Sequence, residues 1–131
     1  MSRFQLEIQA KATDFDAMGH INNVVYLQWV QDVAEAHWKH ISGKNDDKIN
    51  LWVALRHEID YKREIKPEEP IVVETWVNSM EGVRSERMTR IFNPETDQTK
   101  AEARTFWCLL DAKTKRPKRI SEEMKGMYGG V

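Results

Sequence analysis

The stretch that decides the fold runs from Thr13 to Ile41 and reads TDFDAMGHINNVVYLQWVQDVAEAHWKHI. Its second part, from Val24 to Ile41, has the spacing of an amphipathic helix. One stripe contains Tyr26, Val30, Val33, His37 and Ile41. Asn22 or Asn23 can cap the start of this helix and Ser42-Gly43 can end it. Roughly 19 helical residues would span about 28 Å, long enough to lie across several strands.

Segments with the spacing of β-strands lie on both sides of this helix. They are residues 3–12, 51–65, 71–80, 84–92 and 100–112. The last four are joined by short connections, which favours antiparallel pairing. A short helix is expected over residues 122–128. The element order predicts a single α+β domain over residues 1–131, in which a five-stranded antiparallel sheet wraps around one long central helix.

Some apolar side chains fall out of phase with the expected buried face of the sheet. They are Trp52, Val72, Trp76 and Met80. Surface of this kind is typical of an interface with a partner or a ligand. A homodimer, or a tetramer built from dimers, is the simplest arrangement that covers it.

Composition and charge exclude several classes of protein. The chain has 20 Lys and Arg against 21 Asp and Glu, so it lacks the basic excess of a general nucleic-acid binder. No apolar run approaches the roughly 20 residues that cross a bilayer, so no membrane contact is expected. A single cysteine, Cys108, allows no intrachain disulfide and favours a cytoplasmic location. His37 and His40 lack a third ligand at helical spacing, so no metal site is expected.

The segment before the helix concentrates turn formers and groups suited to catalysis. Asp14, Asp16, Gly19, His20 and Asn22-Asn23 all lie within it. A carboxylate can act as a base or nucleophile, while the first N–H groups of the following helix have no partner within the helix. Such N–H groups, here those of Asn23 or Val24, can stabilise a developing oxyanion.

Residues 14–26, DFDAMGHINNVVY, resemble the signature of hot-dog-fold thioesterases. The resemblance is to the 4-hydroxybenzoyl-CoA thioesterase-like group and, more distantly, to plant acyl-carrier-protein thioesterases. It implies a homo-oligomer with its active site at the subunit interface, a thioester of coenzyme A or of acyl carrier protein as substrate, and no metal or other cofactor.

Site residues follow from this resemblance position by position. Asp16 matches the catalytic carboxylate, as nucleophile or general base, and His20, Asn23 and Glu64 are further catalytic candidates. The substrate-binding candidates are Gly19, Asn22, Val24 and Tyr26 near the helix start, with Arg84, Ser85 and Arg87 near the nucleotide phosphates. Met18 replaces the asparagine of the plant pattern, which argues against a mechanism that uses that asparagine. Ile65 replaces the cysteine of that pattern, which argues against thiol catalysis.

Two other functions remain open at this point. A hot-dog enoyl-thioester hydratase or dehydratase would use Asp and His as a dyad, although the spacing from Asp16 to His20 is shorter than is typical. A noncatalytic module that binds acyl thioesters is the second alternative. The sequence leaves the acyl group, the carrier and the role of Asp16 as nucleophile or base undecided.

Overall fold

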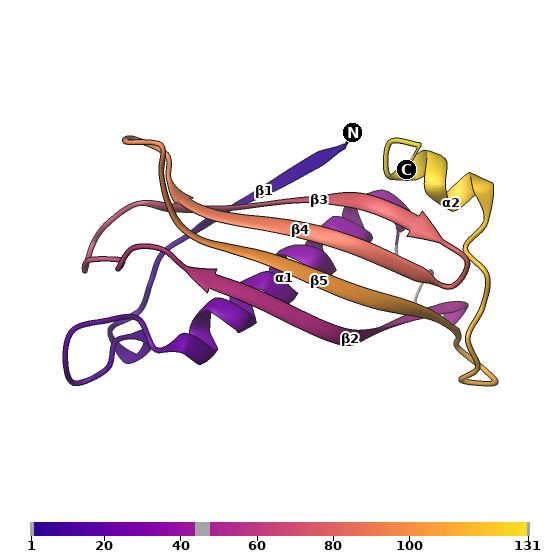
Figure 1. The fold of residues 1–131 in the computed structure, drawn as a ribbon, viewed down its shortest axis with the longest axis horizontal. Helices are drawn as coiled ribbons and strands as arrows, with labels where there is room; N and C mark the ends of the chain where they lie inside the picture. Colours follow the sequence, from indigo (N-terminus) through magenta and orange to yellow (C-terminus); the bar gives the residue numbers. More distant parts are fainter. Residues whose placement is uncertain (1, 44–47, 131) are drawn as a thin grey trace.

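A computed structural model describes residues 2–43 and 48–130 of the chain (Figure 1). The elements are β1 (Arg3–Ile8), a 3-10 turn η1 (Ala12–Asp14), α1 (Asn23–Ser42), β2 (Asn50–Tyr61), β3 (Ile71–Glu81), β4 (Arg84–Asn93), β5 (Gln98–Asp111) and α2 (Glu122–Met127). The predicted order of one strand, a long helix and four strands is confirmed.

The five strands form one antiparallel sheet in the order β1-β3-β4-β5-β2. The strands on either side of α1, β1 and β2, therefore lie at opposite edges. The connection from β2 to β3 passes across the end of the sheet. Figure 1 shows α1 lying along one face of the sheet, so the expected hot-dog arrangement is confirmed. No helix in the described ranges is long and apolar enough to cross a membrane.

The buried side of α1 is the stripe that the sequence predicts. Tyr26, Val30, Val33 and His37 are all buried in the structure. Tyr26, Val30 and Val33 pack in one cluster with inward-facing strand residues such as Val73 of β3. Fully burying an aliphatic side chain contributes about 1.5–3 kcal/mol, so this stripe attaches the helix to the sheet.

Two strands are shorter than predicted. β1 ends at Ile8, whose partner is Ile71, the first residue of β3. Pro70 precedes that partner, so β3 offers nothing further for β1 to pair with. β2 ends at Tyr61 because the next two backbone amides, of Lys62 and Arg63, both turn toward the carbonyl of Lys100.

The predicted pattern of buried residues is wrong in two places. The alternation over residues 51–65 puts Val53 and Leu55 on the apolar face of the strand, but they are 39% and 51% exposed. The reason is that β2 is an edge strand and a bulge between Ala54 and Arg56 shifts its alternation. Val72 and Met80 were expected to face a partner, but both are buried within this chain.

A buried guanidinium lies between the sheet and the second half of α1. Arg87 of β4 donates hydrogen bonds to His37 Nδ1 at 2.9 Å and to Thr75 Oγ1 at 3.1 Å, and it lies over the rings of Trp38 and Tyr128. Burial lowers the pKa of Arg87 to about 10. Burial, and then the charge of Arg87, lower the pKa of His37 to about 4, so His37 is neutral at physiological pH.

We expect His37 to make the stability of the fold depend on pH. Between its folded pKa of about 4 and its ordinary value of 6.5, the unfolded chain binds a proton at His37 that the folded chain does not. The free energy of unfolding therefore rises with pH through this window, with a contribution of about 2 kcal/mol between pH 5 and pH 7.5. Urea unfolding of the wild type and His37→Gln at both pH values measures this contribution.

The matched control is His40→Gln, because His40 is exposed on the same helix. It should keep most of the pH dependence of the wild type, because the charge of His40 is the smallest of the three causes that lower the pKa of His37. His37→Gln should lose most of the contribution from His37. Equal pH dependence in the wild type and His37→Gln would contradict the assignment.

Candidate active site

A tight turn presents Asp16 immediately before α1. Phe15 and Ile21 form an isolated antiparallel bridge, and the Asp16 amide donates to the carbonyl of His20 at 2.7 Å. Gly19 closes the turn through a bond from its amide to the carbonyl of Asp16 and has a φ of +78°. That left-handed conformation strains other residues, which explains glycine at this position.

One oxygen of the Asp16 carboxylate stabilises this turn. Oδ1 accepts hydrogen bonds from the amides of Met18 at 2.9 Å and His20 at 3.0 Å. Oδ2 is not used by either bond, and the side chain lies in an exposed part of the chain. The turn therefore fixes the orientation of the carboxylate while leaving one oxygen directed elsewhere.

The side chains of His20 and Glu64 contact each other beside this turn. His20 Nε2 lies 2.9 Å from Glu64 Oε2, and both side chains are about half exposed. Glu64 lies three residues after the end of β2, so the pair joins the Asp16 turn to the connection between β2 and β3. The structure thus brings together Asp16, His20 and Glu64, three residues predicted to be catalytic.

The start of α1 lies next to the same turn. The amide of Asn22 donates to the carbonyl of Asp14 at 2.9 Å. Asn22 is the N-cap, and its side chain accepts a 3.3 Å bond from the amide of Val24. The carbonyl of Asn22 accepts from the amide of Val25. Of the two predicted oxyanion donors, Val24 is thus engaged in capping, whereas neither capping bond uses the amide of Asn23.

Two tyrosines border the helix start. Tyr26 is buried, and its ring meets the ring of Tyr61 edge to face at 5.1 Å. The Tyr61 hydroxyl donates to the carbonyl of Asn23 at 3.5 Å. Burial first, and then the proximity of Tyr61, raise the pKa of Tyr26, so its hydroxyl stays protonated. Sequence reasoning named Tyr26 but missed Tyr61, whose position at the end of a strand was the available signal.

The predicted phosphate-binding residues lie at the other end of the sheet. Arg84 pairs with Cys108, whereas Tyr61 pairs with Ala101. The offset of seven positions along β5, from Ala101 to Cys108, corresponds to about 23 Å. Arg84 is exposed, but Ser85 and Arg87 are buried on the face toward α1, which differs from their expected place at the mouth of a site. One chain alone does not bring these residues to Asp16.

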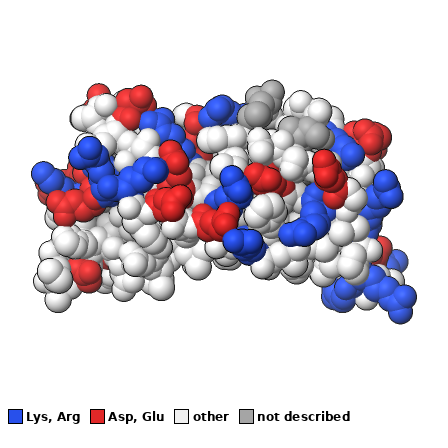
Figure 2. All heavy atoms as spheres, viewed as in Figure 1, with Lys and Arg blue, Asp and Glu red and all other residues white. Residues whose placement is uncertain are grey.

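Basic side chains also gather at that far end. Figure 2 shows blue spheres at the corner where Figure 1 has the turn after β5, which contains Lys113, Lys115 and Arg116. The remaining surface in this view mixes both signs of charge. A local basic cluster therefore exists in a chain whose net charge is only −1.

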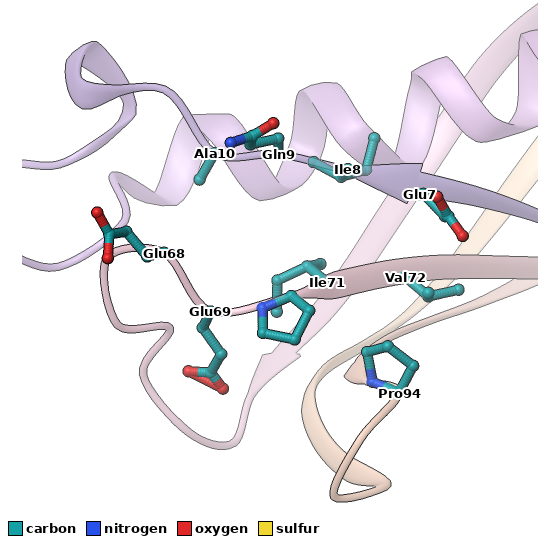
Figure 3. A pocket seen from close by; sticks show the side chains of 10 residues that line it. Glu7, Ile8, Gln9, Ala10, Glu68, Glu69, Ile71, Val72 and Pro94 are labelled. Atoms are coloured by element: carbon teal, nitrogen blue, oxygen red, sulfur yellow. The ribbon is translucent and has the colours of Figure 1, made fainter.

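The structure contains a groove of about 730 Å³ that is lined by none of the predicted site residues. It runs between the end of β1 and the start of β3, and Figure 3 shows the side chains that line it. Its acidic members are Glu7, Glu68 and Glu69. Within the described residues, no group of three His, Cys, Asp or Glu side chains is arranged to hold a metal ion.

Comparison with known families identifies the chain. The family model described as the acyl-ACP thioesterase N-terminal domain matches residues 2–128. The chain belongs to this thioesterase family. The expectation of a thioester hydrolase is confirmed at the level of the family. The matching model represents the acyl-carrier-protein thioesterases, the group with the more distant resemblance in the motif.

Solved structures agree with the hot-dog fold of this thioesterase family. Slr0204, a 1,4-dihydroxy-2-naphthoyl-CoA thioesterase from Synechocystis, is 14% identical with a TM-score of 0.84, covering 97% of this chain and 96% of its own. A DHNA-CoA thioesterase from Staphylococcus aureus is 24% identical with a TM-score of 0.79, covering 91% and 81%. A Thermus thermophilus thioesterase, solved with coenzyme A and Zn, is 18% identical with a TM-score of 0.83, covering 95% and 90%. No curated protein matches the chain by sequence comparison.

Proposed function

We propose that this thioesterase-family protein hydrolyses an acyl thioester of coenzyme A, or of acyl carrier protein, at the end of the molecule that carries Asp16. The observation that carries the proposal is the Asp16 turn itself. In this turn, Oδ1 of Asp16 accepts hydrogen bonds from two backbone amides, and Oδ2 takes part in neither bond. The turn lies beside the start of a 20-residue helix. A carboxylate and a helix-start amide are the two groups that acyl transfer requires.

The reaction divides between these two groups. In one route Asp16 attacks the thioester carbon, the thiolate leaves, and water hydrolyses the resulting anhydride. In the other route Asp16 removes a proton from the attacking water, and that proton leaves on the thiol. In both routes the amide of Asn23 donates to the carbonyl oxygen as negative charge develops there, aided by the positive end of the helix dipole.

The contact between the side chains of His20 and Glu64 supports this arrangement. The amide of His20 donates to Asp16 Oδ1, while its imidazole is held by Glu64 at 2.9 Å. Gly19, Asn22 and Tyr26 shape the same region, and the exposed side chains of Met18 and Val24 offer apolar surface beside it. We assign this apolar surface to the contact with the acyl group.

We further propose that two copies associate through β2. This edge strand is 12 residues long, and Val53, Leu55 and Tyr61 expose apolar surface on it. Antiparallel pairing about a two-fold axis at His57 would set Arg56 opposite Glu58 of the partner subunit. The same register would set Val53 opposite the partner's Tyr61. The strand is therefore complementary to itself in charge and in apolar character.

This pairing would also complete the substrate site. In this register, Tyr61 lies opposite the partner's Val53 on β2. The next neighbours across the partner's sheet are the partner's Cys108 on β5 and the partner's Arg84 on β4. Three strand spacings make this lateral distance about 14 Å. Within one chain, the offset along β5 alone is about 23 Å. We propose that Arg84 of the partner subunit contacts the carrier phosphates while Asp16 acts on the thioester.

Release of free thiol from a panel of acyl-CoA and acyl-carrier-protein thioesters tests the function. We expect release with at least one acyl class, detected with a thiol reagent. Hydration of an enoyl thioester without thiol release would instead indicate a hydratase. Binding without turnover of any substrate would indicate a noncatalytic module. The acyl panel also identifies the acyl group and the carrier.

Mixing two defective variants tests whether the site is shared between subunits. Asp16→Asn should have almost no activity, and Arg84→Glu should raise KM about tenfold through lost phosphate contact. After subunit exchange, one site of each mixed dimer combines a native Asp16 with a native Arg84 from the other subunit. The mixture should regain hydrolysis with the wild-type KM. If the only activity of the mixture has the raised KM of Arg84→Glu, each site is built within one chain.

A further inference from the structure

Lys100 of β5 is a buried charged residue for which the proposed reaction provides no direct role. It is 3% exposed. Its ammonium group meets three acceptors, which are Glu69 Oε2 at 2.5 Å, Gln98 Oε1 at 2.7 Å and the backbone carbonyl of Glu64 at 3.1 Å. An ammonium group has three donors, so these contacts use its full capacity.

Glu69 balances the charge of this lysine. Burial by itself raises the pKa of Glu69, but hydrogen bonds from Lys100, the amide of Lys66 and the side chain of Asn93 bring that pKa below its ordinary value. The carboxylate is therefore ionised at neutral pH. Figure 3 shows Glu69 on the loop that leads into β3, among the residues that line the groove. Lys100 thus ties both ends of the connection between β2 and β3 to β5.

The backbone of Lys100 holds the same connection. Its carbonyl accepts hydrogen bonds from the amides of Lys62 at 2.9 Å and Arg63 at 3.1 Å. Together with the bond from the ammonium group to the carbonyl of Glu64, Lys100 holds three of the four peptide units between Tyr61 and Ile65. These bonds fix the position of the backbone that carries the side chain of Glu64.

A continuous set of contacts leads from this connection to the candidate catalytic carboxylate. Glu64 Oε2 lies 2.9 Å from His20 Nε2. The amide of His20 donates to Asp16 Oδ1 at 3.0 Å. Since His20 and Glu64 are both about half exposed, neither is held in place by burial, and their positions depend on the backbone that carries them.

We propose that Lys100 is a positioning residue for thioester hydrolysis, acting through Glu64 and His20 to hold the Asp16 turn in its reactive geometry. The proposal rests on the proposed function for its effect on rate, but not for its effect on the turn. A displacement of about 1 Å at a reacting group can cost up to a hundredfold in rate, so a distant anchor of this kind has a measurable effect.

The test replaces Lys100 by methionine together with Glu69→Gln, so that no uncompensated carboxylate remains buried. We expect kcat to fall about tenfold with KM within about twofold of the wild type, because the substrate-binding groups are untouched. We also expect hydrogen exchange at the amides of Met18 and His20 to accelerate about tenfold, since both donate to Asp16 Oδ1. Lys100→Arg keeps the charge and serves as the second variant if the first fails to fold. It should change kcat and the two exchange rates in the same direction by a smaller factor.

Two matched controls separate this role from a general loss of stability. Lys62→Met removes a partly exposed lysine of the same connection, whose ion pair with Glu102 spans 3.9 Å, and should leave kcat and the exchange rates unchanged. Glu69→Gln alone keeps the bond from Lys100 to the carbonyl of Glu64 and should keep most of the activity. A melting temperature for each variant reports global stability separately.

A double-mutant cycle decides whether Lys100 acts through Glu64. In a Glu64→Ala background, the Lys100→Met/Glu69→Gln change should lower kcat by less than about twofold, because the route to His20 is already broken. An undiminished tenfold loss in that background, or unchanged exchange at Met18 and His20, would overturn the proposal. If the wild type hydrolyses no thioester, the proposed function fails, while the exchange measurements still test the positioning role by themselves.

Discussion

Replacing Asp16 by asparagine is expected to lower kcat for thioester hydrolysis by about a thousandfold while leaving the melting temperature unchanged. Asparagine keeps an oxygen at the Oδ1 position, so the bonds from the amides of Met18 and His20 are retained. It cannot act as nucleophile or base at the second position. Loss of acid–base or nucleophilic participation costs about 10²–10⁴ in rate. Steady-state thiol release and thermal unfolding measure the two quantities.

The choice of asparagine matters for this experiment. Alanine at Asp16 would remove the acceptor for both amides and loosen the turn, so a loss of activity would have two explanations. Asp14→Asn is the matched control, because Asp14 also accepts a backbone amide, that of Lys11 at 2.7 Å, but is not proposed to react. Full activity in Asp16→Asn would remove Asp16 from the mechanism.

Isotope labelling of the wild type separates the two chemical routes. If Asp16 is the nucleophile, a single turnover of the wild type in ¹⁸O-labelled water gives a product acid without label when water attacks the aspartyl carbon of the anhydride, and the label remains on Asp16. If Asp16 is the base, the label enters the product directly. Mass spectrometry of product and of the peptide containing Asp16 distinguishes these outcomes.

The helix and the loop before it could be predicted because their signals are local. The stripe from Tyr26 to Ile41 depends on 3.6-residue spacing, and the N-cap at Asn22 depends on the chemistry of one side chain. The structure differs from the expected helix by one residue at each end. The Asp16 turn was foreseen as a loop of turn formers, but its internal bonds depend on backbone angles such as that of Gly19.

The order of strands and the buried charges could not be predicted in the same way. Alternation defines two faces for each strand but does not say which strand lies at an edge, and a bulge reverses the faces partway along β2. The resemblance places both Arg84 and Arg87 near the nucleotide phosphates, but Arg87 is buried. Arg87 lies an even number of residues from Ser85 and from Ile91 on β4, so the three side chains share one face of the strand, and this face is buried. Lys100 has no such signal, because two of its three acceptors, on Glu64 and Glu69, lie in the connection between β2 and β3, far from Lys100 in the sequence.

Replacing Leu55 by lysine on β2 is expected to convert a dimer into a monomer and to reduce hydrolysis to less than about one per cent of the wild type. In the proposed register, Leu55 faces the partner's Ile59 at the centre of the strand pair. The change adds a buried charge at each of two symmetric positions, and an unpaired charge in an interface costs several kcal/mol. Sedimentation or light scattering at micromolar concentration, with thiol release on the same samples, measures both effects.

The control for this experiment is Glu102→Lys on the neighbouring strand β5, which also introduces a positive charge but lies away from the free edge. It should remain a dimer and retain activity. Because Leu55 is 51% exposed in the single chain, its replacement should leave the monomer folded, and circular dichroism checks this. A fully active Leu55→Lys monomer would mean that Asp16 needs no second subunit. The shared site would then be wrong even if Asp16 is catalytic. A Leu55→Lys protein that stays dimeric would instead move the interface away from β2.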